Sequence, residues 1–94
     1  MSIYEVELTK KALNDVKKIP KYIVIKLMAW MESVGEEGIE KVRKTPGFHD
    51  EPLKGKLKGL RSIRLSKSYR AIYKIDKNNN IEIIKVVEVN KHEY

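Results

Sequence analysis

The chain of 94 residues, with a mass of 11.0 kDa, is long enough for one domain and too short for two. Hydrophobic residues make up 41% and charged residues 35%, which favours a folded domain over a disordered chain, and the absence of cysteine excludes disulfides and thiolate metal sites. The net charge of +7 is uneven, because residues 1–50 carry nine basic and eight acidic side chains whereas residues 51–94 carry eleven and five.

The first third of the chain predicts a strand followed by two helices. Residues 3–8 alternate apolar and polar side chains, which indicates a half-buried strand. Thr9 stands where a helix N-cap is expected, and Pro20 ends the helix that follows. Lys21–Val34 carries an apolar stripe at helical spacing and predicts the longest helix, with Gly35 as its cap.

The remainder of the chain predicts a short helix, a loop and three strands. Glu36–Lys44 is consistent with a third helix, and Phe48–Gly59 is a loop rich in turn-forming residues. Alternating faces predict strands over Leu60–Leu65 and Tyr69–Ile75, and a third strand follows over Ile81–Val89. The last strand is apolar on both faces in its middle, so we expect it to be central in the sheet.

This order of elements predicts an α+β fold with two layers. It has an N-terminal strand, two or three helices and then a three-strand antiparallel meander, with the helices packed on one face of the sheet. No apolar run reaches the roughly 18 residues of a membrane span, and the N-terminus lacks the basic-then-apolar pattern of a signal peptide. We therefore expect a cytoplasmic protein with no membrane partner.

One segment, residues 54–74, holds eight basic residues and no acidic one. A cluster of this kind indicates a polyanionic partner, most often nucleic acid. The alternative is an ordinary solvated surface, since many soluble proteins are basic, but a neutral half beside a strongly basic half favours the functional interpretation. The basic residues are Lys54, Lys56, Lys58, Arg61, Arg64, Lys67, Arg70 and Lys74.

The strand alternation separates Arg70 from the tyrosines beside it. Tyr69 and Tyr73 share their face with apolar residues, so we expect them in the core rather than stacked on bases. Arg70 then points to the open face of the sheet, where Arg64 and Ser62 of the preceding strand also point. Two arginines on adjacent strands can form a phosphate-binding concavity, and the alternative is a solvent-facing polar sheet.

The two histidines, His49 and His92, lie far apart in the sequence, and with no cysteine they do not predict a metal site. His92 follows the last strand, and its imidazole can exchange a proton near neutral pH. Taken alone, a histidine in a chain tail is more often a surface residue than a catalyst.

These segments together resemble the RelE/ParE superfamily of toxins from type II toxin–antitoxin pairs. The resemblance rests on the loop Pro52–Gly59, the strand that follows it, the Tyr-Arg-x-x-Tyr pattern of Tyr69–Tyr73, and the ending Asn90–His92. It implies one RelE-like toxin domain over residues 1–94 and is closest to the RelE, YafQ and HigB ribonuclease branch. The same fold also serves ParE-type gyrase poisons, which the Tyr-Arg-x-x-Tyr pattern does not separate.

The resemblance implies roles for individual residues. Arg70 matches the arginine that contacts the scissile phosphate, Arg64 matches a basic residue on the preceding strand, and His92 falls at the position of the general acid. No general base is evident at Ser62, and whether His49 takes part stays open. RNA contacts are expected from Lys54, Lys56, Lys58, Arg61, Lys74, Lys91 and Tyr94.

The implied reaction is metal-independent and needs no cofactor. The 2′-OH of one mRNA nucleotide attacks the adjacent phosphate on the ribosome, which inhibits translation. The expected partners are the ribosome with its mRNA and a cognate antitoxin, because an acidic peptide that folds on binding would cover the basic face; the toxin alone is expected to be a monomer. The alternatives are a ParE-like gyrase poison and a non-catalytic RNA-binding module.

Overall fold

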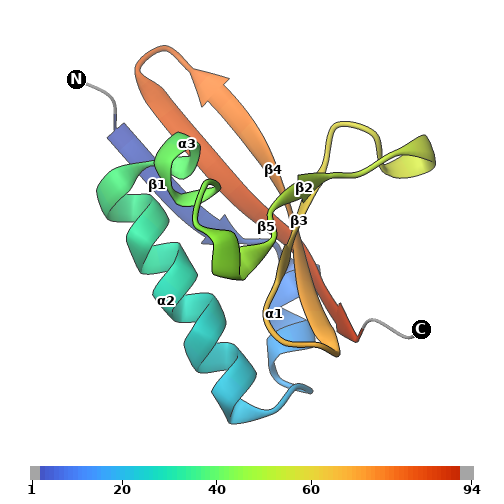
Figure 1. The fold of residues 1–94 in the computed structure, drawn as a ribbon. Coiled ribbons are helices and arrows are strands. Elements are labelled where there is room, and N and C mark those ends of the chain that lie inside the picture. Colours follow the sequence, from blue (N-terminus) through green and yellow to red (C-terminus); the bar gives the residue numbers. More distant parts are fainter. Residues whose placement is uncertain (1–2, 92–94) are drawn as a thin grey trace.

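The computed structural model describes residues 3–91 as a sheet with helices against it (Figure 1). Two single turns of 3-10 helix, Pro46–Phe48 and Gly55–Leu57, interrupt the long loop. Within the described part of the chain, no helix is both long and apolar enough to cross a membrane. The elements in order are β1 (Ile3–Leu8), α1 (Lys10–Val16), α2 (Lys21–Glu37), α3 (Ile39–Val42), β2 (Glu51–Pro52), β3 (Arg61–Arg64), β4 (Tyr69–Asn78) and β5 (Ile81–Lys91).

The five strands form one mixed sheet in the order β1-β5-β4-β3-β2. Strands β3, β4 and β5 are the expected antiparallel meander, and β1 adds to it in parallel with β5. This confirms the α+β class and places β5 between two neighbours, as its apolar middle predicts. The sequence did not predict β2, in which Glu51 and Pro52 pair with Ser62 and Arg61. Two residues are too few for a periodic pattern, and proline is tolerated there because β2 is an edge strand.

The cap of α2 differs from the expected one. The helix passes through Gly35 and continues to Glu37, and Gly38 follows it at φ 85°. A Cβ at position 38 would lie 2.6 Å from the Tyr4 ring, so both the backbone angle and the available space require glycine. The prediction of a cap at Gly35 is therefore wrong, since the apolar stripe alone did not show which glycine adopts the left-handed conformation.

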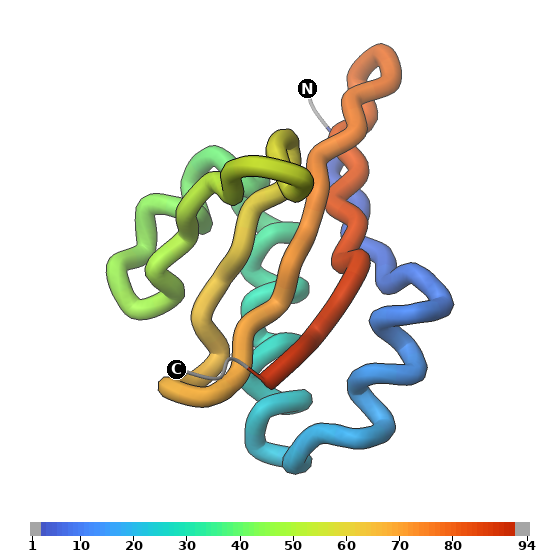
Figure 2. Tube along the Cα trace, turned by 90° about the vertical axis from the view of Figure 1, so that its right-hand side faces the viewer, coloured from blue at the N-terminus to red at the C-terminus, as the bar shows by residue number. Residues whose placement is uncertain are grey.

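The core lies on one side of the sheet, under α2. Figure 2 shows α2 behind β3 and β4, with α1 beside β5. Tyr73 is fully buried, and its ring lies 5.1 Å from the Trp30 ring between centroids, so the Tyr73 face is the helix-covered face, as predicted. The largest fully buried side chains come from α2, α3, the strands and Leu65 directly after β3: Trp30, Tyr73, Ile23, Leu27, Ile39, Ile63, Leu65, Ile84, Val34, Val42 and Val86.

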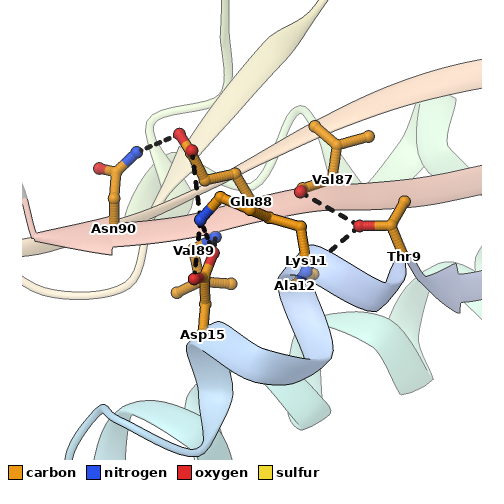
Figure 3. A network of polar contacts seen from close by, with 8 residues as sticks. All are labelled: Thr9, Lys11, Ala12, Asp15, Val87, Glu88, Val89 and Asn90. Atoms are coloured by element: carbon orange, nitrogen blue, oxygen red, sulfur yellow. Dashed lines mark hydrogen bonds and ion pairs between the residues drawn. The ribbon is translucent and has the colours of Figure 1, made fainter.

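Helix α1 covers the edge of β5 that β1 leaves unpaired (Figure 3). Strand β1 ends where Leu8 faces Val86, so the last residues of β5 have no strand on that side. Thr9 Oγ1 donates to the Val87 carbonyl at 3.1 Å and accepts from the Ala12 N–H at 3.2 Å, which confirms Thr9 as the N-cap. The helix thus takes over the role of a strand neighbour at the C-terminal end of β5.

Candidate nucleic-acid-binding cleft

Arg64 and Arg70 lie directly opposite each other on β3 and β4, on the face away from α2. The turn between the strands holds this register, because the Ser66 hydroxyl accepts from the N–H groups of Ser68 and Tyr69 at 3.1 and 3.2 Å. Directly opposed residues in an antiparallel pair have Cα atoms about 4.5–5.5 Å apart, and like charges at that spacing repel. The arrangement therefore favours an anion between or above the two guanidinium groups.

A second observation on Arg70 points to the same ligand class. Its Nε is buried, and no residue of the described range 3–91 accepts a hydrogen bond from it. A buried donor without an acceptor costs about 1–3 kcal/mol, which an oxyanion would recover. The neighbour of Arg70 on β5 is Asn90. The Asn90 side chain donates to Glu88 at 2.7 Å and accepts no hydrogen bond from Arg70 Nε.

The two arginines line a cleft of about 110 Å³ at the C-terminal end of β3, where its pairing with β2 stops. Arg64, Arg70 and Lys67 give it positive charge, and Glu51 is its only carboxylate among the described lining residues. Ser62 is 4% exposed and lies on the same strand face as Arg64, as predicted. The full lining consists of His49, Glu51, Ser62, Ile63, Arg64, Ser66, Lys67, Tyr69 and Arg70.

His49 and Glu51 enter the cleft from the loop before β3, and neither was assigned to the site from the sequence. By its place in the sequence, Glu51 stands where YafQ-like toxins carry a histidine before the Pro-Leu of the loop, and whether His49 substitutes for that histidine stays open. The register Glu51↔Ser62 of β2 and β3 brings this segment beside Arg64. The pairing of β2 with the start of β3 would have placed both residues at the cleft. A strand of two residues has no periodic pattern, however, so the sequence does not reveal this pairing.

Asp50, between these two residues, points the other way into the protein. Its side chain is 0% exposed, Arg61 Nε donates to Oδ1 at 2.7 Å, and the Tyr73 hydroxyl donates to Oδ2. Burial, followed by the hydrogen bond to Asp50, raises the pKa of the Tyr73 phenol well above its usual value. The phenol consequently stays protonated and remains a donor at physiological pH.

The same contact places Arg61 on the helix side of the sheet, opposite Tyr73 and away from the Arg64–Arg70 pair. Its guanidinium is engaged by the buried carboxylate and its side chain is 23% exposed. The sequence predicts an RNA contact from Arg61, whereas the structure gives this side chain a carboxylate partner within the fold.

The other predicted RNA-binding residues are spread around the cleft. Lys54, Lys56 and Lys58 are exposed on the loop around the second 3-10 turn and do not line the cleft. Lys74 shares the strand face of Arg70 but lies 3.9 Å from Asp76, and Lys91 lies opposite Tyr69 on the other face. His92 and Tyr94 lie outside the described residues.

On the far side of the arginine pair, a polar network joins α1 to the end of β5 (Figure 3). Asp15 accepts from the Val89 N–H at 3.0 Å and from Lys11 at 2.9 Å, and Lys11 also lies 3.6 Å from Glu88. Burial by itself raises the pKa of Asp15, but the hydrogen bonds from Lys11 and Val89 outweigh it and hold that pKa below its usual value. The end of β5 is thereby fixed next to Arg70.

The fold and the cleft together define a small basic α+β protein whose sheet carries an arginine-lined cleft. The family described as the ParE toxin of the type II toxin–antitoxin system parDE matches residues 6–93. Because this match spans nearly the whole chain, the chain belongs to that family of toxins. A search of curated protein sequences gives no match.

Solved structures of related toxins share the fold. YafQ from Escherichia coli superposes with a TM-score of 0.74 at 19% identity, over 95% of this chain and 93% of YafQ. The RelE–RelB complex from the archaeon Pyrococcus horikoshii gives 0.69 at 22% identity, over 94% and 93% of the chains. The RelBE2 toxin–antitoxin complex from Mycobacterium tuberculosis gives 0.66 at 26% identity, over 98% and 94%. The resemblance to the RelE/ParE superfamily is therefore confirmed.

Proposed function

We propose that this toxin is an endoribonuclease that cuts mRNA on the ribosome. The observation that carries the proposal is the opposed Arg64–Arg70 pair, with its buried unpartnered Nε, in a cleft that also holds Glu51 and His49. A phosphodiester fits this arrangement, because its phosphorus can lie between two guanidinium donors and a group that accepts a proton.

The reaction is an internal transfer. The 2′-oxygen attacks the adjacent phosphorus, the bond from phosphorus to the 5′-oxygen breaks, and the products carry a 2′,3′-cyclic phosphate and a 5′-OH. Arg64 and Arg70 offset the charge that builds on the phosphorane oxygens, which is the largest single contribution in many enzymes of this kind. Orientation of the 2′-OH in line with the leaving oxygen supplies much of the remainder.

Glu51 is the best candidate for the base that takes the 2′-OH proton. Its carboxylate oxygens can accept a proton from the 2′-OH directly, and Glu51 pairs with Ser62 beside Arg64. His49 is the second group of the cleft that can accept a proton. His92, as the acid that protonates the 5′-oxygen, completes the proposal.

The exposed lysines of the loop, Lys54, Lys56 and Lys58, neutralise phosphates of messenger or ribosomal RNA beside the cleft. A cognate antitoxin is the second proposed partner. The related RelE–RelB and RelBE2 structures are toxin–antitoxin complexes, and an acidic antitoxin segment over the arginine pair would offset its repulsion and close the site.

A ParE-like attack on DNA gyrase is the second candidate, because the matching family is described by its ParE toxin. It uses the same fold and basic face but predicts DNA-damage signalling with intact mRNA. The two candidates therefore differ in which nucleic acid carries breaks after induction.

The test is controlled expression of the wild type, Arg70→Ala and Lys77→Ala, with mapping of mRNA 5′-OH ends within minutes. Lys77 is an exposed basic residue on the β4–β5 hairpin, outside the cleft lining, and serves as the matched charge control. We expect codon-phased cuts and growth arrest with the wild type and Lys77→Ala, and neither with Arg70→Ala. Growth arrest without mRNA cuts rejects the nuclease and selects gyrase.

A further inference from the structure

Asp50 separates the two proton-accepting groups of the cleft, yet its own side chain faces the core. His49 and Glu51 line the cleft, whereas the Asp50 side chain between them has no exposed surface. Alternation of neighbouring side chains explains the opposite directions of Asp50 and Glu51, since Glu51 begins a strand. A carboxylate without access to water is costly unless each oxygen has a donor, so its partners define its role.

Both oxygens of Asp50 are engaged by the sheet. Arg61 Nε donates to Oδ1 at 2.7 Å from β3, and the Tyr73 hydroxyl donates to Oδ2 from β4. Arg61 and Tyr73 are themselves direct cross-strand partners, so the two donors come from one rigid pair. The Tyr73 ring is fully buried and packs on Trp30 of α2, which ties the carboxylate to the centre of the core.

The backbone beside Asp50 has an unfavourable conformation that surrounding contacts must hold in place. His49 has φ 46° and ψ 50°, the left-handed conformation that a residue with a Cβ adopts at a cost. This conformation persists only where its surroundings over-determine it. The reversal at His49 comes directly after the 3-10 turn Pro46–Phe48 and turns the chain back towards β3, where Glu51 pairs with Ser62.

We propose that Asp50 is a positioning residue that, through Arg61 and Tyr73, holds His49 and Glu51 against the Arg64–Arg70 pair. The inference rests on the proposed function, because it gives Asp50 the task of fixing the proton acceptor relative to the phosphate site. A displacement of about 1 Å in such a group can lower a rate by about a hundredfold. Asp50 itself touches no reacting atom.

The test compares the wild type with Asp50→Asn and Tyr73→Phe. For each purified protein, kcat and KM are measured on mRNA-programmed ribosomes, and the NMR coupling between the amide and α protons of His49 reports its backbone angle. We expect Asp50→Asn to lower kcat about 10- to 100-fold with less than a threefold change in KM, because the basic groups that bind RNA remain. Tyr73→Phe keeps the Arg61 contact and should lose about 3- to 10-fold.

The matched control is Val34→Ala, which removes buried volume from α2 and leaves both side chains that bind Asp50, Arg61 and Tyr73, in place. At equal residual stability it should retain the wild-type kcat and the wild-type His49 coupling. An Asp50→Asn protein with unchanged kcat and unchanged coupling overturns the proposal, and so does an equal kcat loss in Val34→Ala. If Asp50→Asn does not fold, Tyr73→Phe carries both readouts. If the wild type cuts no mRNA, the nuclease is rejected and the His49 coupling alone decides whether Asp50 positions this segment.

Discussion

The two flanks of the arginine pair are held by two different aspartates. On the β2 side, Asp50 is fully buried and binds two side chains of the sheet. On the β5 side, Asp15 is 13% exposed and binds a backbone N–H and an exposed lysine. Both act where the strand ladder stops, since β2 is two residues long and β1 ends opposite Val86. At the end of a sheet, side-chain hydrogen bonds therefore hold the chain segments in place, as backbone pairing between strands does in the middle of the sheet.

The comparison predicts unequal costs for removing the two carboxylates. Asp50→Ala leaves Arg61 and Tyr73 facing each other without an acceptor, so the free energy of unfolding should fall by about 3–5 kcal/mol. Asp15→Ala frees one backbone N–H at a site that water can reach, so the loss should be about 1–2 kcal/mol. Urea unfolding of the two variants measures both values, and equal losses would contradict the difference in burial.

Alkaline pH should reduce the stability contributed on the Asp50 side of the arginine pair and not that contributed on the Asp15 side. The raised pKa of Tyr73 means that the stability it contributes is fully present below about pH 10, the ordinary pKa of tyrosine, and is lost as pH rises further. The wild type should therefore lose its advantage over Tyr73→Phe progressively above about pH 10. Unfolding titrations of both proteins check this, and parallel curves through that range would argue against a buried phenol.

Acid should weaken the Asp15 flank. Because the pKa of Asp15 is lowered in the folded state, its contribution is present above about pH 4, the ordinary aspartate value, and is lost as pH falls through the lower folded pKa. The stability difference between the wild type and Asp15→Asn should shrink below about pH 4. A difference that stays constant down to pH 2 would show that Asp15 titrates normally.

The smallest expected effect concerns the arginine pair between the two flanks. Replacing one of two opposed like charges relieves repulsion, so Arg64→Gln should raise the free energy of unfolding by about 0.2–1 kcal/mol while growth arrest is lost. Urea unfolding measures the gain, and Arg43→Gln, in which an arginine 2.8 Å from Glu40 is lost, is the control that should not stabilise. A destabilised Arg64→Gln would mean that Arg64 supports the fold.

Much of this structure follows from patterns in the sequence. The period of two in β3 and β4 placed Tyr73 in the core and Arg64 with Arg70 on the opposite face, because one buried face fixes the register of a strand. Thr9 was found as an N-cap because the residue type and the following helical spacing agree.

The parts that sequence reasoning missed depend on contacts between distant residues. In the sequence, Asp50 cannot be told apart from other polar loop residues, because its partners Arg61 and Tyr73 are distant in the chain. The true cap of α2, Gly38, is set by the nearby Tyr4 ring, which no local pattern reveals. The place of His49 in the cleft follows from a left-handed backbone angle, which a non-glycine residue adopts uncommonly and which the sequence pattern does not indicate.

The central claim is that Arg64 and Arg70 form the phosphate site, and arginine side-chain NMR tests it most directly. A short RNA with 2′-O-methyl groups, which cannot be cleaved by internal transfer, is titrated into the protein while the Nε–Hε signals are followed. We predict that the Arg70 and Arg64 signals shift with RNA, whereas the signal of Arg61, already bound to Asp50, stays in place. An unmoved Arg70 signal, with shifts confined to lysines of the loop, would contradict the account.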